Sequence, residues 1–219
     1  MITLDFLAVL RDWPSLVQGL VMTSVLTLVA AVFGVSLGIA CAWARVNASI
    51  PFRVVVAVYV ELIRNTPFIV QLFFIFFGLP GLGIKLSPEA ASVLAMVINL
   101  GAYSAEIVRA GLEATPRGQT EAGESLALSR TQIFLHVVLP PSLARVWPAL
   151  ASQIVIVMLG SAVCGQIAAQ ELSYFANLIQ SRNFRAFEAF IIAAVLYLGL
   201  AVALRALLNA IGRRWLLVR

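Results

Sequence analysis

The feature that most constrains this chain is a series of long segments without a single charged side chain. Three such segments cover residues 13–44, 65–84 and 146–170. A helix needs roughly 20 apolar residues to cross the hydrocarbon core of a membrane. The chain is therefore predicted to be an all-α membrane protein that crosses the bilayer several times.

Two shorter uncharged segments, residues 90–105 and 189–204, also predict spans. They reach full length once a charged residue is allowed at a helix end, where a long side chain extends to the interface. We predict one transmembrane domain over residues 1–219 with five spans. The spans are placed near residues 16–44, 54–78, 88–112, 146–170 and 187–209.

The distribution of basic residues predicts the orientation of the chain. Five spans place the termini on opposite sides, and cytoplasmic loops carry an excess of arginine and lysine. One side has Arg45, Arg53, Arg109, Arg117, Arg130, Arg145, Arg205, Arg213, Arg214 and Arg219, and the other has Arg11, Lys85, Arg182 and Arg185. We therefore expect an external N-terminus and a cytoplasmic C-terminus. No nucleic-acid partner is indicated, because the arginines are spread over separate loops.

Several kinds of chemistry are excluded by residues that the sequence lacks. A phosphate-binding P-loop ends in glycine, lysine and a hydroxyl residue, whereas the only lysine, Lys85, lies between Ile84 and Leu86. One histidine and two distant cysteines give no metal-binding spacing. His136 is far in sequence from Ser161, which disfavours an intramembrane hydrolase. No metal, cofactor or catalytic residue is expected in this chain.

Polar side chains inside two adjacent predicted spans recur at helical spacing. The first group is Glu61, Arg64, Phe68 and Gln71, and the second is Asn99, Tyr103 and Glu106. Spacings of three and four residues place each group on one face of a helix. Charged groups at membrane depth are costly and usually face a bundle interior or a water-filled pathway. We interpret the two groups as the lining of a passage for a polar solute, such as a zwitterion.

A structural interpretation of the same residues remains open. Glu61 and Arg64 would then pair with each other, and the amides would link neighbouring helices. Pro67 removes a helical hydrogen bond, so it either frees a backbone carbonyl beside a cavity or only kinks the span. Small residues at Gly34 and Gly38 predict close helix packing, as does the cluster of Gly160, Ser161, Cys164 and Gly165 in the fourth span.

Residues 113–141 form the one long polar stretch, and they predict two short cytoplasmic helices near 116–127 and 130–138. Thr115 and Pro116 fit the N-cap and first position of one helix. Ser129 and Gln132 fit a capping box for the next. The sequence Leu139-Pro140-Pro141 is expected to stop the second helix.

The same stretch has an apolar and a charged face. We expect Leu126, Ile133, Val137 and Val138 to hold the two helices against the spans, and Glu121, Glu124 and Arg130 to face outward. A compact charged helix between two spans is suited to docking in the groove of another protein.

Three stretches carry a resemblance to a known family. "EAGESLALSRTQIFLHVVLPPSLARVWPAL" resembles the cytoplasmic EAA loop of permease subunits of ATP-binding-cassette importers. "VELIRNTPFIVQLFFIFFGLP" and "AYSAEIVRAGL" are similar to the polar amino-acid branch of that family. The resemblance implies a five-span type I importer domain in the bacterial inner membrane. Its implied partners are a second permease subunit, two cytoplasmic ATPases that bind ATP and magnesium, an external solute-binding protein, an amino-acid substrate and membrane lipid.

The resemblance also implies a role for the polar stretch, with the helix around residues 121–128 as the coupling helix that contacts the ATPase. The implied coupling residues are Glu121, Ala122, Gly123, Glu124, Ala127, Leu139 and Pro140. The family usually has alanine where Gly123 stands and glycine where Ala127 stands. It also often has a charged residue before Ser161, where this chain has only Leu159 and Gly160, which hints at one half of a heterodimer.

Two other classes of function compete with an ATP-driven permease. An ion-coupled secondary transporter usually shows inverted repeats, and the five unequal spans show no correspondence between halves. A purely structural subunit would use its polar residues only to join helices. The amino acid that is carried and the choice between homodimer and heterodimer stay open at the level of sequence.

Overall fold

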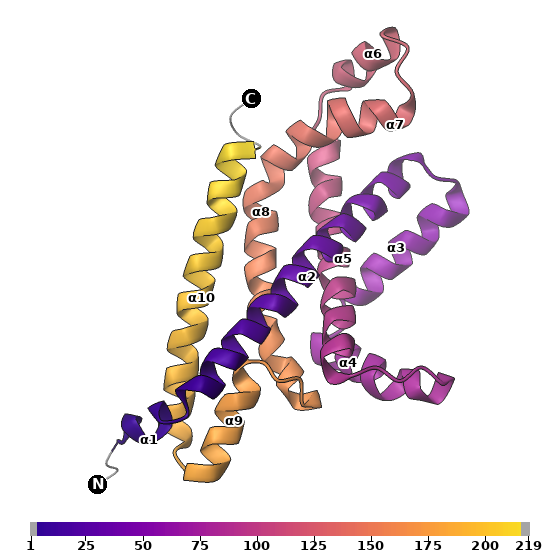
Figure 1. Cartoon of the computed structure of the whole chain (residues 1–219). Coiled ribbons are helices and arrows are strands. Elements are labelled where there is room, and N and C mark those ends of the chain that lie inside the picture. Colours follow the sequence, from indigo (N-terminus) through magenta and orange to yellow (C-terminus); the bar gives the residue numbers. More distant parts are fainter. Residues whose placement is uncertain (1–3, 216–219) are drawn as a thin grey trace.

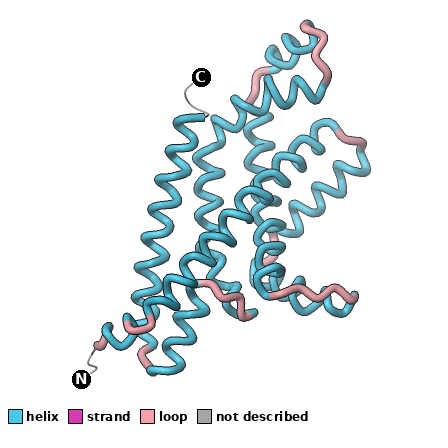
Figure 2. Tube along the Cα trace, in the orientation of Figure 1, coloured by secondary structure: helices cyan, strands magenta, loops and turns pink. Residues whose placement is uncertain are grey.

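The structure is a computed structural model that describes residues 4–215, which form helices joined by short loops (Figures 1 and 2). The helices are α1 Phe6–Leu10, α2 Trp13–Asn47, α3 Ile50–Arg64, α4 Phe68–Phe73, π-helix η1 Phe74–Gly78, 3₁₀-helix η2 Leu79–Leu82, α5 Pro88–Glu113, α6 Arg117–Ser125, α7 Arg130–Gln132, π-helix η3 Ile133–Val138, α8 Leu139–Gly160, 3₁₀-helix η4 Ser161–Ile167, α9 Leu172–Asn183 and α10 Ala186–Trp215.

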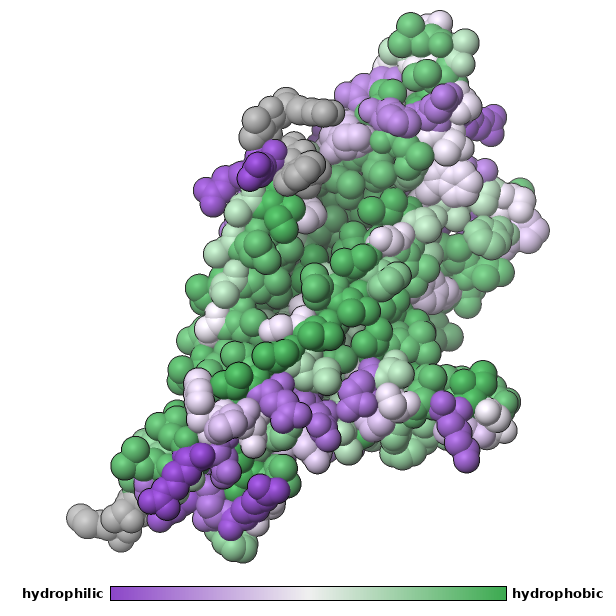
Figure 3. Space-filling model, in the orientation of Figure 1, coloured by the Kyte–Doolittle hydropathy of each residue, from purple (hydrophilic) through white to green (hydrophobic). Residues whose placement is uncertain are grey.

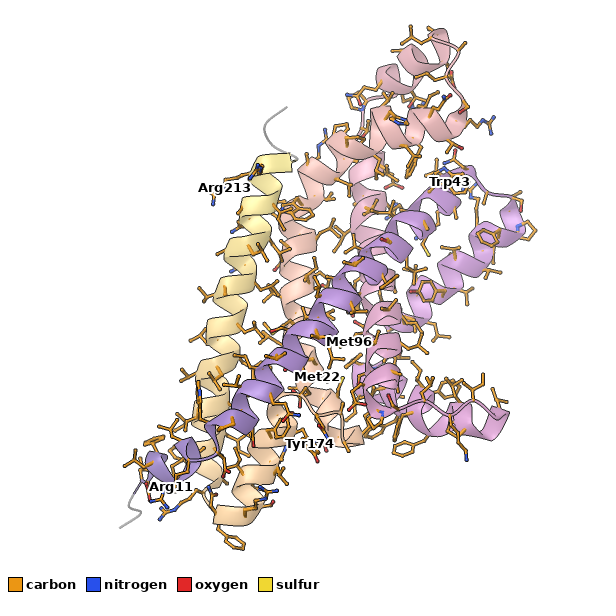
Figure 4. All side chains as sticks on the ribbon, viewed as in Figure 1. Arg11, Met22, Trp43, Met96, Tyr174 and Arg213 are labelled. Carbon is orange, nitrogen blue, oxygen red and sulfur yellow. The ribbon has the colours of Figure 1, made fainter. Side chains whose placement is uncertain are left out.

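The long helix α2 crosses α5 at the centre of the bundle, where Met96 belongs to the main hydrophobic core and the partly buried Met22 packs against it (Figure 4). Glycine allows this close approach, as the sequence predicts. A Cβ atom on Gly38 would lie 2.4 Å from Ser104 Cβ, and one on Gly34 would lie 2.9 Å from Leu100 Cβ. Small residues let membrane helices approach until their backbones nearly touch. The α2–α5 pair is therefore the closely packed centre around which the other helices are arranged.

Apolar side chains cover the middle of the molecule and polar ones gather toward its two ends (Figure 3). On α10, Val195, Leu198 and Val202 are 61 to 65% exposed. Large exposed apolar surfaces are rare on soluble monomers. Four helices are long and apolar enough to cross a membrane, namely α2, α5, residues 130–167 and α10. These four helices coincide in position with the first, third, fourth and fifth predicted spans.

The second predicted span, near residues 54–78, is not one straight helix. The chain bends by 112° between Ile50–Arg64 and Phe68–Leu82. The residues Asn65, Thr66 and Pro67 leave the helical conformation, and Pro67 takes the N-cap position of α4. The residue before a proline is disfavoured in the α conformation, so the break falls before Pro67. The two halves make five spans only when they are counted together.

The prediction that Leu139-Pro140-Pro141 ends a helix is wrong. The chain stays helical from Arg130 to Ile167, through η3 and into α8. The prolines lie in the first turn of α8, directly after the π-helix η3. A proline inside a helix removes one backbone hydrogen bond, but the helix continues here.

The two ends of the described chain lie at opposite ends of the bundle. The end of α10 with Arg213 lies on the same side as α6 and α7, and Arg11 lies at the other end (Figures 1 and 4). This arrangement agrees with an odd number of crossings. Arg219, which was counted among the cytoplasmic arginines, lies outside the described residues.

Replacement of Gly38 by alanine tests the packing of α2 on α5. We expect Gly38→Ala to destabilise the folded protein by about 1 to 3 kcal/mol, because overpacking forces side chains or backbone to shift. Thermal unfolding in detergent measures the change. Gly199→Ala is the control, because a Cβ at Gly199 on α10 would meet nothing within 4 Å. Equal stability of the two variants would contradict the packing role.

Candidate functional site

The break between α3 and α4 leaves backbone carbonyls without helical partners, and the side chain of Gln71 binds them. Gln71 Nε2 donates to Ile63 O at 2.7 Å and to Thr66 O at 3.0 Å. It also lies 2.9 Å from Thr66 Oγ1. Irregular backbone within a membrane is tolerated only where protein or a water-filled cavity satisfies it. Gln71 therefore supplies the donor that the missing helical turn does not.

Asn99 connects this break to the central helix α5. Asn99 Nδ2 donates to Gln71 Oε1 at 2.9 Å, and both residues are only 8% exposed. Two amides from the two predicted polar groups thus meet in the protein interior. Buried amide pairs of this kind hold their geometry because each unmade hydrogen bond would cost about 1 to 3 kcal/mol.

A cavity of about 450 Å³ lies between the break, α5 and α8. Its lining consists of Thr66, Pro67, Phe68, Asn99, Tyr103, Gln153, Ile156, Val157 and Gly160. Three predicted pathway residues, Phe68, Asn99 and Tyr103, line this cavity. The volume falls in the range of small-molecule sites, which combine apolar walls with a few placed polar groups. The absence of a side chain at Gly160 leaves open space, because no heavy atom lies within 4 Å of a Cβ built there.

Arg64 lies beside the cavity without lining it. Its guanidinium carbon is 5.6 Å from the centre of the Tyr103 ring, within reach of a cation–π interaction. The Tyr103 hydroxyl donates to Arg64 O at 3.4 Å. Arg64 is exposed, as is Glu61.

The structural interpretation that pairs Glu61 with Arg64 is wrong, because no ion pair of Glu61 occurs among the described residues. The prediction of one continuous polar face over Glu61, Arg64, Phe68 and Gln71 is also wrong. The helix ends at Arg64, and the 112° bend sends Phe68 and Gln71 in another direction. The second group, Asn99, Tyr103 and Glu106, does lie on the single helix α5.

Glu106 lies outside the cavity lining and forms ion pairs with two arginines. Arg45 on α2 contacts its carboxylate at 3.0 Å, and Arg109 contacts the other oxygen while also bridging to Glu113. Each of the three central side chains is about one quarter exposed. The network ties α2 to α5, about one helical turn beyond Tyr103.

Sequence reasoning missed Thr66, Gln153 and the arginine partners of Glu106. Gln153 is a polar residue inside the uncharged stretch 146–170, and no hydrogen bond of its amide occurs among the described residues. A glutamine within such a stretch was a usable signal, although the stretch also holds Gln166 and Gln170. The role of Thr66 was not visible, because it depends on where the helix breaks.

The polar segment carries exposed groups on α6. Glu121, Ala122 and Glu124 are exposed, whereas Gly123 is buried against η3. A Cβ on Gly123 would lie 2.8 Å from Ile133 Cγ1. Glycine at this position therefore lets α6 pack on the following helix.

Two expectations about this segment are wrong. Leu126 is 75% exposed and does not hold α6 against the spans. Thr115 does not cap α6, since Pro116 occupies the N-cap position. Instead, the Thr115 hydroxyl hydrogen-bonds with Ser142 at 2.8 Å. It thereby joins the end of α5 to α8.

Other expectations for the segment are confirmed. Ser129 and Gln132 form the predicted capping box of α7. Ile133 is buried, and Val137 and Val138 are half-buried. Leu139 is buried in a cluster with Val108 and Phe134, and Pro140 follows at the start of α8. The helix α6, with its exposed face, thus lies beside well-packed residues of η3 and the start of α8.

The turn after α6 forces Ala127 into a left-handed conformation, with φ of 56°. Leu128 N donates to Gly123 O, and Ala127 N donates to Glu124 O. These two bonds define a Schellman motif, in which glycine is preferred at the left-handed position.

The sequence is similar to those of known membrane transport proteins. The family model described as "Binding-protein-dependent transport system inner membrane component" matches residues 34–217. The L-cystine transport system permease protein TcyB of Bacillus subtilis (strain 168) is 34% identical over 92% of this chain and 87% of its own length. The glutamine transport system permease protein GlnP of Escherichia coli (strain K12) is 34% identical, with 96% of this chain and 97% of that protein covered.

The fold is also similar to those of solved transporter structures. The crystal structure of an amino acid ABC transporter with histidines has a TM-score of 0.86 and 35% identity, over 97% of this chain and 100% of that chain. An inward-facing structure of the MetNI methionine ABC transporter has a TM-score of 0.75 at 21% identity, over 93% of this chain and 97% of that chain. The second likeness is one of fold.

Replacement of Ala127 by glycine tests the strained turn. We expect Ala127→Gly to stabilise the folded protein by up to about 1 kcal/mol, because glycine adopts the left-handed region without a steric penalty. Calorimetric or fluorescence-monitored unfolding of the purified protein measures the change. Ala122→Gly is the control and should destabilise by a similar amount, since Ala122 lies inside α6. Destabilisation by Ala127→Gly would contradict the assignment of strain.

Proposed function

This chain belongs to the family of inner-membrane components of binding-protein-dependent transport systems, and we propose that it is the permease subunit of an ATP-binding-cassette importer for polar amino acids. The observation that carries the proposal is the cavity beside the broken helix. It combines irregular backbone, two amides and two hydroxyl side chains with apolar walls. Such a site at membrane depth suits a small polar solute on its way across the bilayer.

The lining indicates the kind of amino acid that the cavity takes. The nine lining residues include no carboxylate and no basic side chain. The α-ammonium group of a solute would meet amide and hydroxyl oxygens, and Arg64 near Tyr103 would attract its carboxylate. A basic side chain on the solute would find no negative partner. The cavity therefore favours amino acids with uncharged polar side chains.

Energy for transport would enter through α6. Its exposed groups include Glu121, Glu124 and the apolar side chain of Leu126. A protruding helix with charged and apolar side chains fits a groove on a partner ATPase, and ATP with magnesium would bind in that partner. Ala122, Gly123, Ala127, Leu139 and Pro140 would shape and anchor this contact. This subunit would perform no hydrolysis and would convert ATPase motion into alternating access.

The assembly and orientation complete the proposal. A second permease subunit, identical or homologous, would face the cavity, and an external solute-binding protein would deliver the amino acid. The last turn of α10 carries Arg213 and Arg214 and lies at the same end as α6 (Figure 1). By the positive-inside rule, this end would face the cytoplasm and α1 would lie outside. The similarity to ATP-binding-cassette permeases favours this function over an ion-coupled secondary transporter.

Replacement of Gln153 by leucine tests the cavity as a solute site. We expect Gln153→Leu to raise the solute concentration for half-maximal uptake about tenfold, because a hydrogen bond to a charged group contributes about 1.5 to 3 kcal/mol. ATP-driven uptake of amino acids into proteoliposomes containing the whole complex measures the change. Gln18→Leu, at an exposed glutamine on α2, is the control. Unchanged uptake by Gln153→Leu would argue against this cavity as the site.

Replacement of Glu121 by lysine tests the contact with the ATPase. We expect Glu121→Lys to abolish solute-stimulated ATP hydrolysis and uptake while leaving membrane insertion intact, because the charge is reversed on the exposed face of α6. The paired assay measures both activities in proteoliposomes. Glu89→Lys, at the opposite end of the molecule on α5, is the matched control. Normal coupling in Glu121→Lys would remove Glu121 from the proposed contact.

A further inference from the structure

The amide of Gln71 has only one favourable orientation. Its nitrogen faces Ile63 O and Thr66 O, at 2.7 Å and 3.0 Å. Both of these atoms are carbonyl oxygens, which accept hydrogen bonds and never donate them. The Thr66 hydroxyl donates its own hydrogen to Leu62 O, so it too acts as an acceptor toward Gln71. A reversed amide would place Gln71 Oε1 against three acceptors.

The orientation of Gln71 determines that of Asn99. Gln71 Oε1 is the atom that remains for Asn99, and Asn99 must therefore present its nitrogen, which donates at 2.9 Å. Asn99 Oδ1 accepts no hydrogen bond from the described residues. Asn99 also lines the cavity of about 450 Å³. The carbonyl groups of the break fix the orientation of the Gln71 amide, and Gln71 in turn fixes that of Asn99. As a result, the atom of Asn99 left without a partner is the acceptor Oδ1.

We propose that Gln71 is a positioning residue that orients Asn99 so that Asn99 Oδ1 accepts a hydrogen bond from the α-ammonium group of the transported amino acid. This inference rests on the proposed function and adds to it the orientation of the bound amino acid. The ammonium group binds on the side of Asn99, and the carboxylate lies toward Arg64, next to Tyr103. With the opposite orientation, Asn99 would present an amide nitrogen to a cation, which is repulsive. Discrimination for the ammonium group therefore depends on a residue that does not line the cavity.

A pair of ligands separates this role from a merely structural one. The first ligand is whichever of the twenty L-amino acids binds most tightly to the purified wild-type complex by calorimetry. The second is its α-deamino analogue, which keeps the carboxylate and side chain but lacks the ammonium group. We expect the wild-type complex to prefer the amino acid by at least about tenfold, as a buried hydrogen bond to a charged group predicts.

Replacement of Gln71 by methionine removes the orienting amide at similar side-chain length. We expect Gln71→Met to reduce the preference for the ammonium group about tenfold, with little change in the affinity for the deamino analogue. Gln18→Met, at an exposed glutamine 3.5 Å from Gln170 Oε1, is the matched control and should keep the wild-type preference. If Gln71 had only a structural role, its replacement would lower the affinities for both ligands by the same factor.

A second variant tests the orientation itself. The double variant Gln71→Met with Asn99→Asp has an oxygen on both arms of residue 99, so it needs no orienting partner. We expect this double variant to restore a preference of at least about tenfold for the ammonium-bearing ligand. If Gln71→Met fails to fold, Asn99→Leu with Gln71 intact provides the test, because loss of Asn99 Oδ1 must then reduce the preference for the ammonium-bearing ligand about tenfold. An unchanged preference in Asn99→Leu would overturn the proposal.

The outcomes separate the two proposals. Equal weakening of both ligands by Gln71→Met, or no restored preference in the aspartate double variant, overturns the orienting role while the cavity remains a solute site. If the wild-type complex binds none of the twenty amino acids and Gln153→Leu leaves uptake unchanged, the cavity is not an amino-acid site, and both proposals are overturned.

Discussion

The need to satisfy backbone groups within a membrane is the constraint on which this structure depends. A helix meets that need internally, whereas the 112° bend between α3 and α4 does not. Gln71 resolves the difficulty by donating to two carbonyl groups of the break. The cavity exists because the chain leaves the helix there, and the break is stable because a side-chain amide replaces the lost donors. The proposed solute site and a contact that preserves the fold thus belong to the same part of the chain.

The cavity and the exposed face of α6 are joined by continuous helix. Residues 130–167 form one helical stretch of 38 residues, with η3 under α6 at one end and Gln153 at the cavity wall. The Thr115 hydroxyl binds Ser142, and Arg145 donates to Ala114 O at 2.8 Å, so α5 is fastened to the same stretch. Helices transmit displacement well because their hydrogen bonds are local and their cores are densely packed. In the proposed function, a shift of α6 would therefore be passed to α5 and α8, which both line the cavity.

Much of the fold follows from residue patterns that act locally. The uncharged segments predict four of the spans, the glycine spacing in α2 predicts a close helix contact, and Ser129 with Gln132 predicts a helix start. These signals are reliable because their causes lie within a few residues or in the surrounding lipid. The break at Pro67 is different, since a proline within a span allows either a kink or a full bend. In the structure the bend is held by Gln71, which donates to Ile63 O and Thr66 O and accepts from Asn99, and these contacts form only once the chain has bent.

The candidate site was predictable in part for the same reason. Phe68, Asn99 and Tyr103 line the cavity as expected, but periodicity assigned Gln71 to a continuous face that the break removes. Glu106 was assigned to the pathway although Arg109 lies one helical turn away, and its second partner, Arg45, is 61 residues away in sequence. Gln153 was overlooked because its position at a cavity wall depends on how α5, α8 and the break pack together. Residues whose roles depend on distant partners carry no local signature.

The two unusual positions in the polar segment show how tertiary contacts change the meaning of a motif. The family pattern places alanine at position 123 and glycine at position 127, and this chain has the reverse. Ile133 packs so closely on α6 that a Cβ at position 123 would approach it to 2.8 Å, which explains Gly123. Ala127 then accepts a left-handed conformation at a cost of roughly 1 to 2 kcal/mol, because the Schellman bonds and the buried Ile133 together determine the turn. Packing on η3 thus keeps the exposed face of α6 in place. The same packing imposes a left-handed conformation on Ala127, although glycine would be favoured there.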